Sequence, residues 1–186
     1  LENKEIIALE AHRLGPFNDH LTAESVVFDL MIHDIDVIQS LVDSPVRHVD
    51  AVGTQSRSSE IDHAIAHLKF DNSVLGTATS SHVTHKKVRS LAVTTRNVYI
   101  QLDYQQQQIT VSRRESEQTT MLQGAAGYRT ETIEETPFIQ TREPLKNELE
   151  HFLDCVRSRS RPMVDADDGI ATIELATNIV DAIRSH

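Results

Sequence analysis

Apolar and polar residues alternate through most of residues 46–111, and this pattern constrains the fold more than any other feature of the chain. The alternation is clearest in His63–Phe70, where Ala64, Leu68 and Phe70 share one face and His67 and Lys69 share the other. A period of two predicts strands with one face on a core. The strands expected in this block cover residues 46–53, 63–70, 74–83, 88–94 and 97–104. Turn-forming residues at 71–73 and 95–97 predict two hairpins.

Helices and a few further strands flank this block. The strand-like segments are Ile6–Leu14, a short strand around residues 109–111 and an extended segment at 131–139, with a polar, mobile excursion expected at 115–127. The expected helices cover residues 26–42, a segment that starts at Pro144, and a segment that starts near Asp168. Segregated strands and helices predict an α+β fold. We expect an open-faced, mostly antiparallel mixed β-sheet with helices packed on one face, and a second face that is solvated or used for subunit contact.

Composition narrows the class of protein. A length of 186 residues fits one domain over residues 1–186. The net charge of −10 and the scattered basic residues argue against nucleic acid as a partner. Cys155 is the only cysteine, so no intramolecular disulfide can form, and a buried, inert thiol is expected. Without an apolar run of about 18 residues or a signal peptide, we expect no membrane insertion and a cytoplasmic chain.

The expected helix at 26–42 is apolar nearly all round, which predicts a buried helix. It nevertheless contains Asp29, His33 and Asp36, which follow the i, i+4, i+7 rows of one face. Three interpretations are open. The polar residues could be structural, or His33 and Asp36 could bind a metal, although no further ligands are visibly arranged with them. In the third, Asp29 orients His33 as a proton acceptor near neutral pH. Four more histidines lie between residues 63 and 85, where solvent-facing or interface roles are favoured over a metal site.

The segment Phe28-Asp29-Leu30-Met31-Ile32-His33-Asp34-Ile35-Asp36 resembles the Asp-x-x-x-His-x-x-Asp segment of the glucose–fructose oxidoreductase, inositol dehydrogenase and MocA family. There it opens the first helix of the second domain, beside the nicotinamide. The segments from Glu143 to Phe152 and from Asp167 to Ala176 resemble the two closing helices of that family. The resemblance spans nearly the whole chain and implies the C-terminal, substrate-binding and oligomerisation domain of an NAD(P)-dependent dehydrogenase.

The resemblance also implies roles for individual residues. Asp29 and His33 would be the catalytic pair. His33 would take the proton of the substrate hydroxyl, and Asp29 would orient the sugar and share charge with a lysine from another domain. Asp36 matches a recurring position on the substrate side, although its place one turn further along suggests a structural role. The expected partners are a sugar, nucleotide-sugar or polyol substrate and a second copy of the chain, in a homodimer or tetramer formed through the sheet face. The alternative is a non-catalytic ligand-binding or scaffold relative with the same fold.

The chain departs from the family pattern in two respects. Ser25-Val26-Val27 and Met31 stand where many members have glycines. No G-x-G-x-x-G and no Glu-Lys-Pro segment is present, so NAD or NADP would be bound mainly by an N-terminal Rossmann domain that this chain lacks, and we assign it no cofactor-binding or metal-binding residues.

The residues after the first expected strand bear on the substrate. The segment His12-Arg13-Leu14-Gly15-Pro16-Phe17 resembles the substrate-contacting segment of nucleotide-sugar 3-dehydrogenases that act on UDP-linked amino sugars. Arg13 and Pro16 are therefore expected to contact substrate. Arg13 could pair with a phosphate or a carboxylate. Alternatively, Arg13 is a surface residue at a strand end and Gly15-Pro16 forms only a turn.

Overall fold

The structure is a computed structural model that describes residues 5–17, 24–114, 118–122, 125–129, 132–140 and 143–185. One sheet contains β1 Ile6–Leu14, β2 Val46–Thr54, β3 His63–Phe70, β4 Leu75–Ser81, β5 Val88–Thr95, β6 Val98–Asp103, β7 Gln108–Arg114 and β10 Thr132–Glu135. The helical segments are the π-helical turn η1 Val27–Met31 and the helices α1 Ile32–Leu41, α2 Pro144–Ser158 and α3 Ala166–Arg184.

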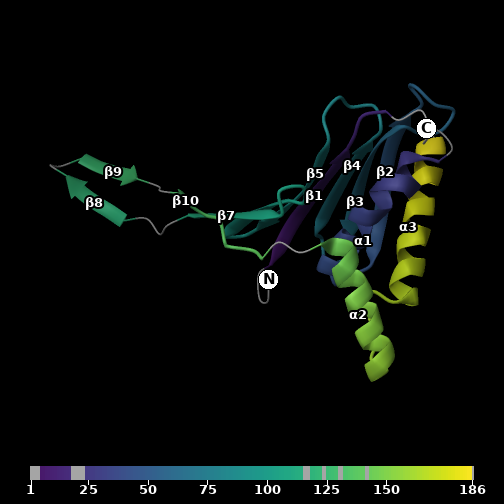
Figure 1. Ribbon diagram of the computed structural model, residues 1–186. Helices are drawn as coiled ribbons and strands as arrows, with labels where there is room; N and C mark the ends of the chain where they lie inside the picture. Colours follow the sequence, from purple (N-terminus) through teal and green to yellow (C-terminus); the bar gives the residue numbers. More distant parts are fainter. Residues whose placement is uncertain are drawn as a thin grey trace.

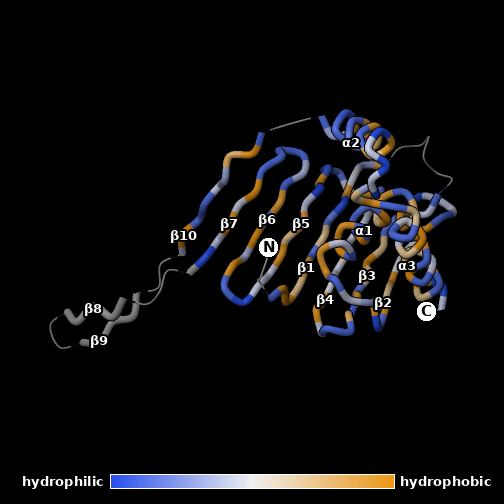
Figure 2. The backbone as a smooth tube through the Cα atoms, turned by 90° about the horizontal axis from the view of Figure 1, so that it is seen from below, coloured by the Kyte–Doolittle hydropathy of each residue, from blue (hydrophilic) through white to orange (hydrophobic). Residues whose placement is uncertain are grey.

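The eight strands follow the order β10-β7-β6-β5-β1-β4-β3-β2, which Figure 2 shows across the width of the molecule. All neighbours are antiparallel except β1 and β4, which run parallel. The expected α+β fold with an open-faced, mostly antiparallel mixed sheet is therefore confirmed. The parallel pair places the ends of β1 and β4 side by side, with Leu14 opposite Ser81.

The segment expected to be an excursion at 115–127 contains regular structure that the sequence did not reveal. β8 Gln118–Leu122 and β9 Ala125–Arg129 pair antiparallel in a separate two-stranded sheet. Residues 115–117 and 123–124 lie outside the described residues, as do residues 18 and 19 of the expected loop after β1. The described helices include none that is long and apolar enough to cross a membrane.

The core lies between one face of the sheet and the helical layer formed by η1, α1 and α3 (Figure 1). Met31, Ile35 and Ile38 are fully buried in it and belong to the same hydrophobic cluster as Leu9 of β1. Gly76 of β4 permits the close approach of α1 to the sheet, because a Cβ there would lie 3.3 Å from Cγ2 of Ile38. The covered part of the sheet is β1 to β4, and β5, β6 and β7 extend beyond α1.

The expectation that the first helix is buried on all sides is wrong within the described structure. Phe28 is 38% exposed, and His33 is also exposed, while Val27 and Met31 face the core. The sequence pattern misled because an apolar helix surface can also face another part of a larger protein. The same applies to α2, which runs away from the sheet (Figure 1). Its predicted apolar stripe is mostly uncovered, with Leu149 54% and Phe152 58% exposed.

The loop between β2 and β3 is organised by the buried carboxylate of Asp62. This carboxylate accepts backbone N–H bonds from Ser56 at 2.9 Å, Arg57 at 2.6 Å and Ser58 at 3.2 Å. Burial by itself would raise the pKa of Asp62, but these hydrogen bonds outweigh it and hold the pKa below its usual value. The ionised carboxylate is therefore the form that stabilises the loop.

Asp62→Asn is expected to lower the free energy of unfolding at neutral pH by about 1–3 kcal/mol, because an amide accepts these bonds more weakly. A depressed folded-state pKa gives stability that is complete above the unfolded pKa of about 4 and is lost as the pH falls through the folded value. Urea denaturation across this pH range should therefore show a smaller acid-dependent loss in the variant. Asp71→Asn, in the exposed turn after β3, is the matched control. Equal behaviour of the two variants would contradict this role of Asp62.

Candidate active site at the ends of β1 and β4

The candidate site is built where β1 and β4 end beside η1. Gly15, directly after β1, donates its N–H to the Ser81 carbonyl at 2.8 Å and accepts from the N–H and hydroxyl of Thr84. On the helical side, Val26 donates its N–H to the Ile61 carbonyl at 2.7 Å. These bonds fix the start of the helical segment next to the ends of both strands.

Asp29 lies inside the π-helical turn and is held from the sheet. His82, directly after β4, places Nε2 2.7 Å from Oδ2 of Asp29. Because a carboxylate only accepts, the imidazole N–H is the donor. The His82 side chain is 12% exposed and that of Asp29 is 33% exposed, so the pair is largely shielded from solvent. π-Helical turns inside helices often occur at functional sites.

A backbone connection supports both members of this pair. The Asp62 carbonyl accepts the N–H of His82 at 2.8 Å, and the neighbouring Ile61 carbonyl accepts the N–H of Val26, three residues before Asp29. The loop that Asp62 organises therefore positions the two halves of the pair together.

His33 lies four residues after Asp29, in the first turn of α1, and its side chain is exposed. Within the described part of the chain, Asp29 bonds to His82 and not to His33. The direct contact between Asp29 and His33 that the acid–base interpretation assumed is thus replaced by a contact with a second histidine. An exposed imidazole can still exchange a proton with a bound hydroxyl group.

Arg13 and Asp34 form a largely buried ion pair beside this site. Nε and Nη2 of Arg13 each donate to one carboxylate oxygen of Asp34 at 2.8 Å, in a bidentate arrangement. The side chains are 14% and 3% exposed, respectively. Although burial alone would lower the pKa of Arg13, the hydrogen bonds and charge of Asp34 raise it. We expected this guanidinium to be able to pair with a phosphate or carboxylate of the substrate. In the structure it is already paired with the carboxylate of Asp34.

The remaining two expected site residues lie apart from this pair. Pro16 is exposed in the loop after β1, on the side where β4 ends. Asp36 faces α3, where Oδ1 accepts the hydroxyl of Thr172 at 3.1 Å. This contact ties Asp36 of α1 to α3, whereas Asp29 is held from the sheet by His82.

Neither Arg13–Asp34 nor Asp29–His82 was identified from the sequence. The members of the first pair are 21 residues apart and those of the second are 53 residues apart. The signal that would have found them is the parallel pairing of β1 with β4, which no local pattern encodes. Among the described residues, no group of three or more His, Cys, Asp or Glu is placed to hold a metal ion.

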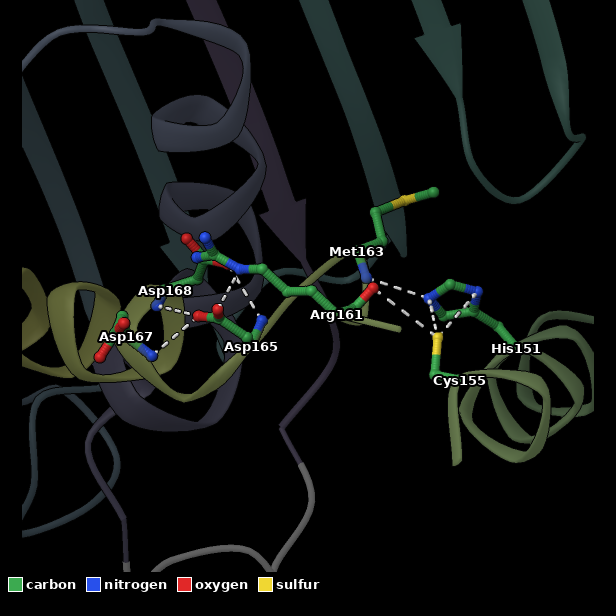
Figure 3. A network of polar contacts seen from close by, with 7 residues as sticks. All are labelled: His151, Cys155, Arg161, Met163, Asp165, Asp167 and Asp168. Atoms are coloured by element: carbon green, nitrogen blue, oxygen red, sulfur yellow. Dashed lines mark hydrogen bonds and ion pairs between the residues drawn. The ribbon is translucent and has the colours of Figure 1, made fainter. Parts of the chain in front are cut away.

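A second polar network connects α2 to α3 and is shown in Figure 3. Nε2 of His151 accepts the N–H of Met163 at 3.0 Å and lies 3.6 Å from Sγ of Cys155, which is 8% exposed. Arg161 pairs with Asp165, whose carboxylate also accepts the N–H groups of Asp167 and Asp168 in the capping box of α3. These contacts order the connection between the helices, so we assign the network a structural role.

Comparisons with known proteins agree with this description. Residues 18–186 match the family described as "Oxidoreductase family, C-terminal alpha/beta domain". The UDP-N-acetylglucosamine 3-dehydrogenase of Acidithiobacillus ferrooxidans is 25% identical over 177 residues, which are 95% of this chain and 54% of that protein. A solved structure of that enzyme has a TM-score of 0.83 at 24% identity and covers 98% of this chain and 56% of its own.

Two more distant solved structures share the fold. An aldose–aldose oxidoreductase from Caulobacter crescentus, complexed with glycerol, has a TM-score of 0.76 at 17% identity and covers 97% of this chain and 54% of its own. The WlbA dehydrogenase from Bordetella pertussis, in complex with NADH and UDP-GlcNAcA, has a TM-score of 0.69 at 16% identity, with coverages of 99% and 54%. This chain therefore spans about half the length of these relatives, and it belongs to the oxidoreductase family as its C-terminal alpha/beta domain.

Proposed function

We propose that this chain is the substrate-binding half of an NAD(P)-dependent oxidoreductase that acts on a secondary hydroxyl of a sugar, nucleotide sugar or polyol. One observation carries the proposal. In the helix that matches the family, an exposed imidazole, His33, follows four residues after a carboxylate, Asp29, that His82 holds at 2.7 Å. The names of the relatives, which include sugar and nucleotide-sugar dehydrogenases, support the same class of substrate.

In this proposal, His33 accepts the proton of the substrate hydroxyl while the C–H hydrogen leaves as hydride. Asp29 accepts a hydrogen bond from a sugar hydroxyl and fixes the orientation of the ring. His82 holds the Asp29 carboxylate so that no reorientation is needed when substrate arrives. Pro16 borders the substrate, and Arg13 contacts the substrate from the end of β1 while it remains bound to Asp34.

A bound nicotinamide would accept the hydride. The described residues are compatible with such a group, because Phe28 and His33 of the helical segment are both exposed. They include no glycine-rich turn between a strand and a helix that could hold dinucleotide phosphates. We therefore propose that an N-terminal Rossmann domain of the full-length protein binds NAD or NADP.

The exposed apolar face of α2 supports a further domain in the full-length protein. Leu145, Leu149 and Val156 are each more than half exposed along one side of the helix. Surface of this kind is costly to leave in water and is typical of an interface. We propose that the cofactor domain covers this face of α2.

The face of the sheet that points away from the helices is the proposed contact in a homodimer or tetramer. Leu75 is 50% and Tyr99 37% exposed on this face. Sedimentation analysis of the full-length protein would test this contact.

The most direct test of domain organisation is the coding sequence upstream of Leu1. We expect a strand followed by G-x-G-x-x-G and, later, a Glu-Lys-Pro segment. An unrelated upstream domain would contradict the dehydrogenase proposal.

His82→Ala is expected to lower kcat of the full-length protein about 10- to 100-fold, because a misplaced orienting group costs this much. His82→Gln retains an N–H donor for Asp29 and should recover part of the loss, while the Kd for the cofactor stays unchanged in both variants. His85→Ala, three residues further along and exposed, is the control and should retain full activity. If Ala and Gln lose activity equally and in step with lowered thermal stability, His82 has only a structural role.

A further inference from the structure

A cavity of about 770 Å³ lies beside α1, over the part of the sheet that the helices leave open. The ends of β1 and β6, the starts of β5 and β7, and the first turn of α2 contribute to its wall. Arg89 precedes the buried Leu91 by two residues, so its side chain lies on the helical side of the sheet, as does that of Arg13. The volume is within the usual range for a small-molecule site.

Three cationic side chains line this cavity, Arg13, Lys87 and Arg89, in a chain whose net charge is −10. Arg13 and Arg89 are directly opposite each other in the β1–β5 register. Like charges in opposite positions destabilise a sheet unless an anion compensates them. Asp34 compensates Arg13.

Among the residues that the structure describes, no such partner compensates the other two cations, Lys87 and Arg89. Within the described ranges, no carboxylate forms an ion pair with Lys87 or Arg89. Asp103 is the carboxylate in the wall, and its Oδ1 accepts the N–H groups of Gln105 and Gln106. The arrangement therefore leaves two cationic side chains facing the cavity without an anion.

Neutral donors complete the wall. Tyr104, at the end of β6, is half-buried in it. Burial, and then the charge of Asp34, raise the pKa of Tyr104, so its phenol keeps its proton and can donate a hydrogen bond. Gln108 and Asn147 add amide donors. Cationic and neutral donors around one hollow favour a ligand rich in anionic oxygens.

We propose that this cavity binds phosphate groups of the substrate, so that the substrate is a sugar linked to a nucleoside diphosphate rather than a free sugar or polyol. The inference rests on the proposed dehydrogenase function of the neighbouring site. Arg13 connects the cavity to the candidate active site, since it lines the cavity and binds Asp34, the residue that follows His33. Lys87 and Arg89 supply the charge that selects the phosphates.

The test is isothermal titration of the full-length protein with UDP, which requires no turnover. We expect UDP and inorganic pyrophosphate to bind, uridine to bind much more weakly, and UDP affinity to fall as salt increases. Arg89→Gln should weaken UDP binding about tenfold or more, the usual effect of losing a charged hydrogen bond. Lys87→Gln, at an exposed position, should weaken it in the same direction and provides a second test if Arg89→Gln does not fold. Arg96→Gln, in the β5–β6 turn, is the control, because this exposed arginine pairs with Glu5 outside the cavity.

Absence of UDP binding, or equal affinities in the Arg89, Lys87 and Arg96 variants, would overturn the phosphate site. If free sugars are oxidised without UDP binding, this inference fails and the proposed dehydrogenase function stands. If UDP binds as expected but no sugar derivative reduces NAD or NADP, the phosphate site stands and the dehydrogenase proposal fails.

Discussion

Replacing His33 by alanine is expected to lower kcat of the full-length protein by about 10²–10⁴-fold, the usual contribution of a group that transfers a proton in the rate-limiting step. The side chain is exposed at the start of α1, so the substitution should leave the free energy of unfolding within about 0.5 kcal/mol of the wild-type value. The Kd for NAD or NADP should also stay nearly unchanged, because we propose that another domain binds most of the cofactor. Steady-state kinetics together with a cofactor titration measure both quantities.

His85→Ala controls for the loss of an exposed histidine near the site. Equal losses in kcat and in cofactor binding would show that His33 has a structural role. An unchanged kcat would show that the proton leaves by another route. A full-length protein without measurable turnover in any form would favour the non-catalytic, ligand-binding alternative.

Asp34→Ala is expected to lower the free energy of unfolding by about 3–5 kcal/mol, because it leaves the guanidinium of Arg13 buried without its bidentate partner. The destabilised region would include the end of β1 and the first turn of α1, so activity should fall as well. Urea denaturation of the purified protein gives the magnitude.

Glu5→Ala is the matched comparison, because it breaks the ion pair of Glu5 with Arg96, whose side chains are 73% and 74% exposed. Solvent screens that pair, so a loss of at most about 1 kcal/mol is expected. Replacing Arg13 and Asp34 together by apolar residues of similar size should recover part of the stability. Similar losses for Asp34→Ala and Glu5→Ala would contradict the importance of the buried pair.

Local sequence patterns located most of the elements of this fold. Alternation identified β3 and its hairpin with β4, and Pro144 marked the start of α2 correctly. These features depend on residues a few positions apart, where side-chain periodicity and turn chemistry act directly. The same patterns placed the end of β4 at Val83, two residues too far, and so included His82 in a strand.

The contacts of the site depend on long-range geometry. The parallel pairing of β1 and β4 follows a crossover of about sixty residues and places His82 beside the end of β1, near Asp29. The packing of α1 against β1 brings Arg13 to Asp34. The π-helical turn at Val27–Met31 has no signature in the sequence, yet it changes which side chains share a face. The resemblance to the family predicted Asp29 and His33 as a catalytic pair, but it did not reveal that Asp29 bonds to His82.

The burial of apolar helix surfaces was the property that the sequence predicted least well. An apolar helix surface indicates that something covers it, but not which part of the protein does so. The uncovered sides of η1 and α2 show this directly, since Phe28 and Phe152 are exposed within this chain. Both surfaces are explained by the proposed cofactor domain.

Hydride transfer by the full-length protein tests the central claim most directly. UDP-linked amino sugars and free sugars should be offered separately with NAD or NADP, while reduced nicotinamide and the ketone product are measured together. The account predicts that both products form in equal amounts with a sugar substrate, and that His33→Ala slows the formation of both by the same large factor while cofactor binding persists. Binding of sugar and cofactor without formation of reduced nicotinamide or ketone would contradict it.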